Sequence, residues 1–203
     1  MRPSLGANIS KTPLPRAFYE RDTVCVAREL LGKILVRRLG PTTMAGIIVE
    51  TEAYRGHDDT ASHAYRGPTT RNIVMFGEPG HAYVYFTYGM HYCLNVTTER
   101  TGQPGAVLIR AAQPIRGIER MKKYRRADRV IDLANGPAKL TQAFDITAAL
   151  NGHDLTAGRK LSIAVNNEPQ AFEINSTSRT GIVSAKEKMW RFYIKGNPFV
   201  SKH

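Results

Sequence analysis

Residues His81–Thr97 read HAYVYFTYGMHYCLNVT, two runs of strand-favouring residues joined by a short connection. Aromatic and β-branched residues favour pleated strands, and glycine favours the tight turn between them. The pattern predicts a β-hairpin with its tip at Tyr88 and Gly89. Alternation along the first strand places Tyr83 and Tyr85 on one face, either as ordinary cross-strand packing or as the lining of a surface or pocket.

Segments on either side of this hairpin extend the same pattern. Further strand-like runs cover residues 33–39, 45–54, 105–112, 160–165, 171–174 and 190–195. Helices are expected after the N-cap residue Asp22, ending near Gly32, over Ile115–Arg126, and from Pro137. Strands outnumber helices and hairpins dominate, which predicts an α+β fold. We expect a single compact domain with a curved, largely antiparallel sheet, flanking helices and a protruding hairpin.

The chain divides into a leader and one domain. Residues 1–16 contain three prolines and no hydrophobic periodicity, so we expect a flexible leader, with the domain over residues 17–203. No run approaches the ~20 apolar residues of a membrane span. Only Cys25 and Cys93 are present, which gives no disulfide framework and fits a reducing compartment. We therefore expect a cytoplasmic monomer without membrane contact, associated with the nucleoid if the source is bacterial.

Charge indicates the class of partner. The chain has 29 Lys and Arg against 17 Asp and Glu, a formal charge of +12. A compact protein this basic attracts polyanions, and nucleic acid is the first candidate. Anionic membranes or heparin-like polymers would also complement this charge. The positive excess concentrates in Arg116–Arg129, whereas Gly46–His63 is acidic. This unevenness suggests a cationic rim that meets a polyanion and carboxylates reserved for chemistry within it.

The acidic stretch contains a Glu-x-Glu pattern on an expected strand. Alternation puts Glu50, Glu52 and Tyr54 on one face. The commoner fate of such carboxylates is a solvated polar face. A second interpretation makes one glutamate a general base beside an aromatic ring. A third is a carbohydrate-active enzyme that uses both carboxylates, ~7 Å apart on the strand, although a charge of +12 is unexpected for neutral sugars.

Two other features bear on function. Tyr88 at a hairpin tip has little core to enter, so the ring either folds back onto its own sheet or serves as a wedge between DNA bases. His57, Asp58, Asp59 and His63 lack a recognised metal-ligand spacing. Phosphate-loop, deaminase and nucleophile-elbow motifs are also missing from the sequence. We therefore expect neither a metal nor an organic cofactor.

At these residues the chain resembles the alkyladenine (3-methyladenine) DNA glycosylases of the mammalian type, a family also found in bacteria. The similarity runs from Phe18 to Ser201. It is carried by ARELLGKILVRRL, IVETEAY, ASHAYRGPTTRN, PGHAYVYFTYGMHYCLNV, GAVLIRAAQP, NGPAKLTQA, SRTGI and RFYIKGNPFVS. The resemblance implies a DNA glycosylase that acts on damaged purines.

The resemblance also implies roles for individual residues. Glu52 would activate the attacking water, Arg110 would position it, and the backbone carbonyl of Thr180 would help. Tyr88 would intercalate in the DNA. The flipped base would be held by a further set of residues: Tyr54, Ala61, His63, Tyr83, Tyr85 and Asn95.

Within that set the implied roles differ. Tyr54, His63 and Tyr85 would sandwich the base, and Tyr83 would support the pocket. Asn95 would guard against normal guanine. Main-chain groups around Ala61 and His63 would read the purine edge.

The implied reaction is hydrolysis of an N-glycosidic bond. The substrate is double-stranded DNA that contains 3-methyladenine, 7-methylguanine, hypoxanthine or ethenoadenine. Stacking of a cationic alkylated purine on Tyr54 and Tyr85 would favour damaged bases by ~0.5–2 kcal/mol per contact. Strand cleavage needs an amine nucleophile, and the matched pocket has no lysine, so a monofunctional enzyme is expected. The alternative is a non-catalytic nucleic-acid-binding protein that uses the basic helix, against which the acidic cluster at residues 50–59 argues.

Overall fold

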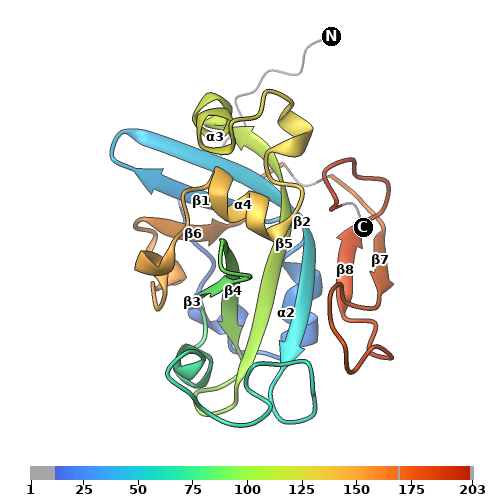
Figure 1. The fold of residues 1–203 in the computed structure, drawn as a ribbon. Helices are drawn as coiled ribbons and strands as arrows, with labels where there is room; N and C mark the ends of the chain where they lie inside the picture. Colours follow the sequence, from blue (N-terminus) through green and yellow to red (C-terminus); the bar gives the residue numbers. More distant parts are fainter. Residues whose placement is uncertain (1–11, 169, 202–203) are drawn as a thin grey trace.

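Residues 12–168 and 170–201 are described by a computed structural model (Figure 1). Their eight strands form one sheet in the order β3–β4–β5–β2–β1–β6, and β8 joins β2 and carries β7. Every strand pair is antiparallel. The α+β prediction of a single compact domain on a curved antiparallel sheet is confirmed.

Strands and helices have the following bounds. The strands are β1 (Ile34–Leu39), β2 (Thr42–Arg55), β3 (Ala82–Thr87), β4 (His91–Thr98), β5 (Gly105–Arg116), β6 (Leu161–Ala164), β7 (Ile174–Thr177) and β8 (Arg191–Ile194). The α-helices are α1 (Arg16–Tyr19), α2 (Thr23–Glu29), α3 (Ile118–Arg125) and α4 (Pro137–Ala143). Short 3₁₀ helices are η1 (Ile73–Phe76), η2 (Val130–Asp132), η3 (Ala148–Leu150) and η4 (Leu155–Ala157).

The long strand β2 organises the sheet. One edge pairs with β5 along most of its length, from Ala45 to Arg55. The other edge pairs first with β1, as far as Ile47, and then with β8, from Glu50 to Glu52. Figure 1 shows β2 and β5 running side by side through the molecule, with β1 and β6 on one side and β8 and β7 on the other. Through β2, the end of the chain joins the centre of the sheet.

The two faces of β2 have different partners, as strand alternation predicts. The Thr51 hydroxyl donates to the carbonyl of Ala27 in α2, at 2.8 Å. Asp22 caps α2 as predicted, because its side chain accepts from the Cys25 N–H. Figure 1 shows α2 behind the central strands and α4 in front of them. The residues on either side of Thr51 therefore face the α4 side.

Register aligns one row of residues across five strands. Tyr83 of β3 pairs with Asn95 of β4, which pairs with Leu108 of β5. Leu108 pairs with Glu52 of β2, and Glu52 pairs with Arg191 of β8. Residues more than 100 positions apart in the chain thus lie in a single cross-strand row.

A β-bulge interrupts the pairing of β2 with β5 next to this row. Glu50 pairs with Ala111 and Thr51 with Ile109, so Arg110 is the extra, unpaired residue of β5. Bulges redirect side chains and increase local twist. The guanidinium of Arg110 consequently reaches carboxylates on β2.

Some sequence-based boundaries differ from the structure. The strand expected at 171–174 lies at Ile174–Thr177, and the helix expected from Ile115 begins at Ile118 because β5 continues to Arg116. Within the expected leader, residues 1–11 lie outside the described residues, whereas Pro13 bridges to Ala164 and Leu14 is buried. No helix among the described residues is long and apolar enough to cross a membrane.

Candidate active site

Two adjoining cavities open on the α4 side of the sheet, with volumes of about 370 and 30 Å³. Tyr54, Ala61, His63 and Tyr85 line both of them. The larger cavity is also lined by Tyr88, Arg110 and Thr180, and the smaller by Tyr83 and Asn95. Every residue that the sequence predicted for the site except Glu52 therefore lines one of the two cavities.

Glu52 lies directly beneath the wall of the larger cavity, with a fully buried side chain. Its Oε1 accepts a hydrogen bond from the Thr180 N–H at 2.7 Å, and its Oε2 accepts one from the Tyr54 hydroxyl at 2.7 Å. Arg110 Nη1 lies 3.4 Å from Oε1. Burial and the adjacent Glu52 raise the pKa of Tyr54 well above its usual value, so its hydroxyl keeps its proton. The contact with Thr180 uses its N–H, whereas the sequence pointed to its carbonyl.

Glu50 is also fully buried, which makes the expectation of a solvated polar face wrong for both glutamates. Arg191 of β8, the strand that pairs with β2, and Ser201 both contact Glu50. Glu50 Oε1 lies 2.9 Å from Arg110 Nε, 2.7 Å from Arg191 Nε and 2.9 Å from the Ser201 hydroxyl. Oε2 accepts from the Ser201 N–H at 2.7 Å.

These contacts determine what Glu50 can do. Burial raises the pKa of Glu50, but Arg110, the Ser201 N–H and Arg191 outweigh it and hold the pKa below its usual range. The carboxylate is therefore charged and fully engaged. Glu50 lines neither cavity, which disfavours a mechanism with two acting carboxylates.

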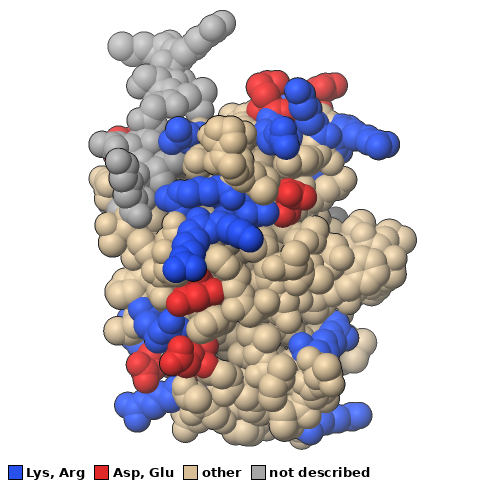
Figure 2. All heavy atoms as spheres, turned by 90° about the vertical axis from the view of Figure 1, so that its left-hand side faces the viewer, with Lys and Arg blue, Asp and Glu red and all other residues tan. Residues whose placement is uncertain are grey.

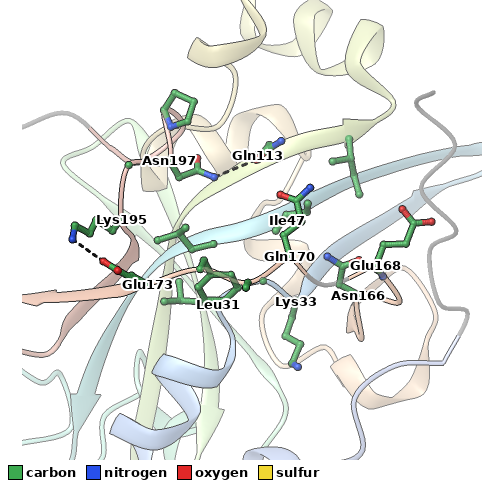
Figure 3. Close-up of a pocket in the computed structure, with 17 residues that line it drawn as sticks. Leu31, Lys33, Ile47, Gln113, Asn166, Glu168, Gln170, Glu173, Lys195 and Asn197 are labelled. Atoms are coloured by element: carbon green, nitrogen blue, oxygen red, sulfur yellow. Dashed lines mark hydrogen bonds and ion pairs between the residues drawn. The ribbon is translucent and has the colours of Figure 1, made fainter. Parts of the chain in front are cut away.

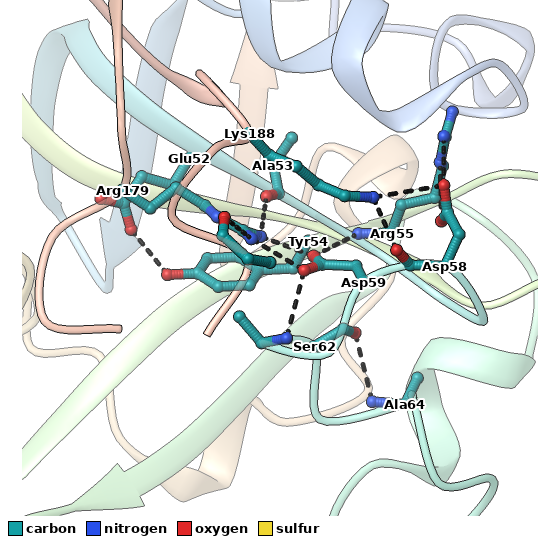
Figure 4. Close-up of polar contacts among 12 residues, drawn as sticks. Glu52, Ala53, Tyr54, Arg55, Asp58, Asp59, Ser62, Ala64, Arg179 and Lys188 are labelled. Carbon is teal, nitrogen blue, oxygen red and sulfur yellow. Dashed lines mark hydrogen bonds and ion pairs between the residues drawn. The ribbon is translucent and has the colours of Figure 1, made fainter. Parts of the chain in front are cut away.

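A third buried ion pair joins the loops that flank the site (Figure 4). Arg179 Nη1 and Nη2 lie 2.5 and 2.7 Å from the two oxygens of Asp59, and both side chains are fully buried. Arg179 Nη1 also donates to the carbonyl of Ala53 at 2.9 Å. The guanidinium lies over the Tyr54 ring, 4.7 Å from its centre. Arg179 thus fixes both Tyr54 and the neighbouring Thr180 N–H.

An aromatic cluster forms the opposite wall. The His63 ring packs edge-on against Tyr85 with centroids 4.7 Å apart, and His63 Nδ1 lies 2.9 Å from the Tyr83 hydroxyl. Asn95 donates to the Tyr83 carbonyl at 3.1 Å. Arg71 lies over the Tyr85 ring, 4.7 Å from its centre. Burial raises the pKa of Tyr83 to about 12, so this wall is neutral apart from Arg71.

Main-chain groups near the pocket are partly engaged within their own loop. The Ala61 N–H donates to Asp59 at 3.2 Å. The His63 carbonyl accepts from the Asn72 side chain at 2.7 Å. If these two groups bind a purine edge, they must do so while keeping or exchanging their hydrogen bonds within the loop.

The hairpin tip projects beside the larger cavity. Tyr88 is 83% exposed, so its ring does not fold back onto the sheet. Tyr88 and Gly89 both have positive φ, 51° and 67°, as two-residue hairpin turns require. Left-handed geometry costs a residue with a side chain ~1–2 kcal/mol. The exposed aromatic lies where the sequence predicted a wedge between DNA bases, and that role stays a prediction.

A separate cavity of about 740 Å³ is lined by Leu31, by Ile47 of β2 and by Gln113 of β5, among others (Figure 3). Four of its polar side chains form two pairs. Lys195 Nζ lies 2.6 Å from a Glu173 oxygen, and the Asn197 amide donates to Gln113. None of the predicted site residues lines it.

The acidic loop holds the residues that were considered as metal ligands, Asp58 and Asp59 among them. Asp58 pairs with Arg55 and Lys188, while Asp59 pairs with Arg179. Among the residues that the structure describes, no group of three or more potential ligands could hold a metal ion.

Comparison with known proteins identifies the family to which this chain belongs. The sequence profile described as methylpurine-DNA glycosylase (MPG) matches residues 17–198. The chain belongs to the methylpurine-DNA glycosylase family. Three relatives carry the name "Putative 3-methyladenine DNA glycosylase". The protein of Carboxydothermus hydrogenoformans is 54% identical over 93% of this chain and 98% of its own length. The protein of Methanocella arvoryzae is 52% identical over 93% of this chain and 96% of its own length. The protein of Koribacter versatilis is 46% identical over 93% of this chain and 93% of its own length.

Membership of this family makes the chain an enzyme of the DNA glycosylase type and sets aside the non-catalytic alternative. The resemblance seen in the sequence is thereby confirmed. The roles of the individual residues remain predictions, because family membership does not test them.

Several residues around the site escaped the sequence analysis: Asp59, Arg71, Arg179, Arg191 and Ser201. Partial signals existed, since the motif SRTGI contains Arg179 and the acidic stretch contains Asp59. Which arginine faces which carboxylate depends on pairing between distant segments.

The Asp59–Arg179 pair yields a stability prediction. Asp59→Asn should lower the free energy of unfolding by ~3–5 kcal/mol, because it leaves a buried guanidinium without its counter-charge. The melting temperature, measured by calorimetry, should fall by roughly 6–20 °C. Asp58→Asn is the matched control, since its half-exposed ion pairs contribute ~0–1 kcal/mol. Equal, small decreases in melting temperature for both variants would contradict the predicted contribution of the buried pair to stability.

His63 yields a pH prediction. His63 is exposed as a residue, but partial burial of its ring against Tyr83 and Tyr85, and then the charge of Arg71, lower the pKa of His63 from 6.5 to about 4. Because protonation favours the unfolded chain, this contribution to stability is present above about 6.5 and is lost as pH falls towards 4. NMR titration of the imidazole should give the depressed midpoint, and His63→Gln should remove this part of the pH dependence. A midpoint near 6.5 would contradict the packing described above.

Proposed function

We propose that this enzyme is a monofunctional DNA glycosylase that flips alkylated or deaminated purines out of DNA and begins base excision repair. Its substrates would be 3-methyladenine, 7-methylguanine, hypoxanthine and ethenoadenine in double-stranded DNA. The observation that carries the proposal is a buried glutamate, Glu52, beneath an aromatic-lined cavity beside an exposed tyrosine, Tyr88. Relatives named for 3-methyladenine support the substrate class.

Base flipping explains the aromatic wall and the hairpin tip. A base inside a duplex cannot reach a protein pocket, and unstacking it costs a few kcal/mol. Tyr54, His63 and Tyr85 would recover part of this cost by stacking, while Tyr88 fills the gap in the helix. The smaller cavity, about 30 Å³, has room for about one or two water molecules. The larger cavity, about 370 Å³, is lined by the same three side chains and would hold the purine.

Glu52 is suited to activate water and to stabilise the developing sugar cation. Cleavage of a glycosidic bond passes through an oxocarbenium-like state, which a nearby carboxylate stabilises. Arg110, held by Glu50, fixes one Glu52 oxygen. Thr180 Oγ1 is buried and has no hydrogen-bond partner among the described residues, so it is placed to bind the same water. Because Glu52 is fully buried, water reaches it only when Tyr54 or the Thr180 loop shifts.

The proposed reaction ends at base release. A lyase step would require an amine that forms a Schiff base with the sugar. Among described residues, no lysine lines either cavity. The products would be the free base and an abasic site.

DNA would bind through distributed positive charge. Figure 2 shows Lys and Arg side chains spread over several parts of one face, with Asp and Glu between them. On α3, Lys122 pairs with Glu119, so this helix is only partly available for phosphate. A net charge of +12 favours DNA overall. We expect a monomer that acts in the cytoplasm, on nucleoid DNA if the source is bacterial.

The direct test uses duplexes that carry a single hypoxanthine or ethenoadenine. Purified protein should convert each lesion to an abasic site that alkali reveals as a strand break. Undamaged duplex should remain intact. Release of neither base by the pure protein would overturn the proposed function.

Glu52 is tested by substitution. Glu52→Gln should keep affinity for lesion DNA within a small factor, because shape and hydrogen bonding survive, while excision slows ~10²–10⁴-fold through loss of the general base. Single-turnover excision and equilibrium binding measure the two effects. Glu20→Gln, at an exposed position, is the control and should leave both unchanged. Near-normal excision by Glu52→Gln would reject this assignment.

Tyr88 is tested by separating stability from flipping. Tyr88→Ser should leave the melting temperature almost unchanged, because an 83% exposed ring buries little apolar area. Excision of a well-paired lesion should slow more than excision from a mismatch or a single strand, where less stacking is broken. Val165→Ser, at another exposed apolar position, should change neither. Equal slowing on all substrates would mean that the wedge lies elsewhere.

A further inference from the structure

Both tyrosines at the base pocket already carry a cation on one ring face. Arg179 lies 4.7 Å from the ring centre of Tyr54, and Arg71 lies 4.7 Å from that of Tyr85. Neither arginine lines either cavity. A base in the pocket would therefore stack on the ring faces opposite the two guanidiniums.

The two arginines differ in charge compensation. The buried site contains three carboxylates, each paired with at least one of three guanidiniums, so its formal net charge is zero: Glu50, Glu52, Asp59, Arg110, Arg179 and Arg191. Arg71 is exposed and forms no ion pair with a described residue. Arg71 is thus an uncompensated positive charge that lies directly against a pocket ring.

The charge of Arg71 acts on the groups around it. After burial, it is the second cause of the lowered pKa of His63. His63 lines both cavities, so the field of Arg71 extends to the place where a base would lie. A cationic base there would meet the same repulsion as a protonated imidazole.

We infer that Arg71 is a specificity-determining residue, whose charge behind Tyr85 weakens the binding of cationic purines relative to neutral ones. The inference rests on the proposed glycosylase function and names the lesion class that this site favours. An aromatic face attracts cations, but a guanidinium on one face opposes a second cation on the other. This reverses the expectation that Tyr54 and Tyr85 favour cationic bases.

The size of the effect follows from distance. Like charges on opposite faces of one ring are ~8 Å apart, and their repulsion changes affinity by ~2-fold in a water-like medium and ~30-fold at a protein-surface dielectric. Because Arg71 is exposed, we expect ~3–10-fold. N-alkylated cations have weaker glycosidic bonds, so the enzyme would still excise them. Arg71 would then reduce the difference in excision rate between cationic and neutral purines.

The test compares a cationic and a neutral lesion in the same duplex sequence. Single-turnover excision of 7-methylguanine and of hypoxanthine is measured for the wild type, Arg71→Gln, Arg71→Lys and Arg66→Gln. Arg71→Gln should raise the 7-methylguanine to hypoxanthine ratio ~3–10-fold over the wild type. Arg71→Lys keeps the charge and should stay near the wild-type ratio. Arg66→Gln removes an exposed charge from the same loop and should leave the ratio unchanged.

The outcomes separate this inference from the function on which it rests. An unchanged ratio in Arg71→Gln would overturn the inference, as would equal slowing of both substrates, which would assign Arg71 to a backbone phosphate. A similar rise in Arg66→Gln would also overturn it, because any nearby charge would then suffice. Failure of the wild type on both lesions would instead overturn the proposed function itself.

Discussion

The burial of carboxylates on strand β2 is the constraint on which the rest of the site depends. Glu50 and Glu52 are fully excluded from solvent, and an unpaired buried charge costs several kcal/mol. Arg110 reaches both of them from a bulge in β5, and Arg191 and Ser201 close over Glu50 from the end of the chain. Glu50 therefore keeps its full set of partners only when Arg191 and Ser201 have docked beside β2.

The sequence predicted the features that depend on local pattern. Alternation along β2 placed Glu50, Glu52 and Tyr54 on one face, and the Thr51 contact with α2 confirms that Thr51 lies on the other. The hairpin with Tyr88 at its tip also follows from local residues. These are consequences of strand geometry and turn chemistry, which act within a few residues.

Long-range pairing could not be read from the sequence in the same way. Glu50 looked like a surface carboxylate because nothing near it in the chain indicates that Arg191 pairs beside it. The bulge that directs Arg110 towards the glutamates depends on the register between β2 and β5. A register shift of one residue moves every side chain of a strand to the other face of the sheet. Asp59 and Arg179 are 120 residues apart, so their pairing follows from the docking of two loops on β2.

Access to the site links recognition to chemistry. Glu52 has no exposed surface, so an attacking water reaches it only if the side chains around it move. Tyr54 connects this step to base binding, because its hydroxyl donates a hydrogen bond to Glu52 and its side chain lines both cavities. A base that displaces the Tyr54 ring would lengthen its hydrogen bond to Glu52 and free a carboxylate oxygen for water. Glu52, the proposed catalytic base, would then become accessible only when a nucleotide occupies the pocket, which is how binding energy can be converted into selectivity.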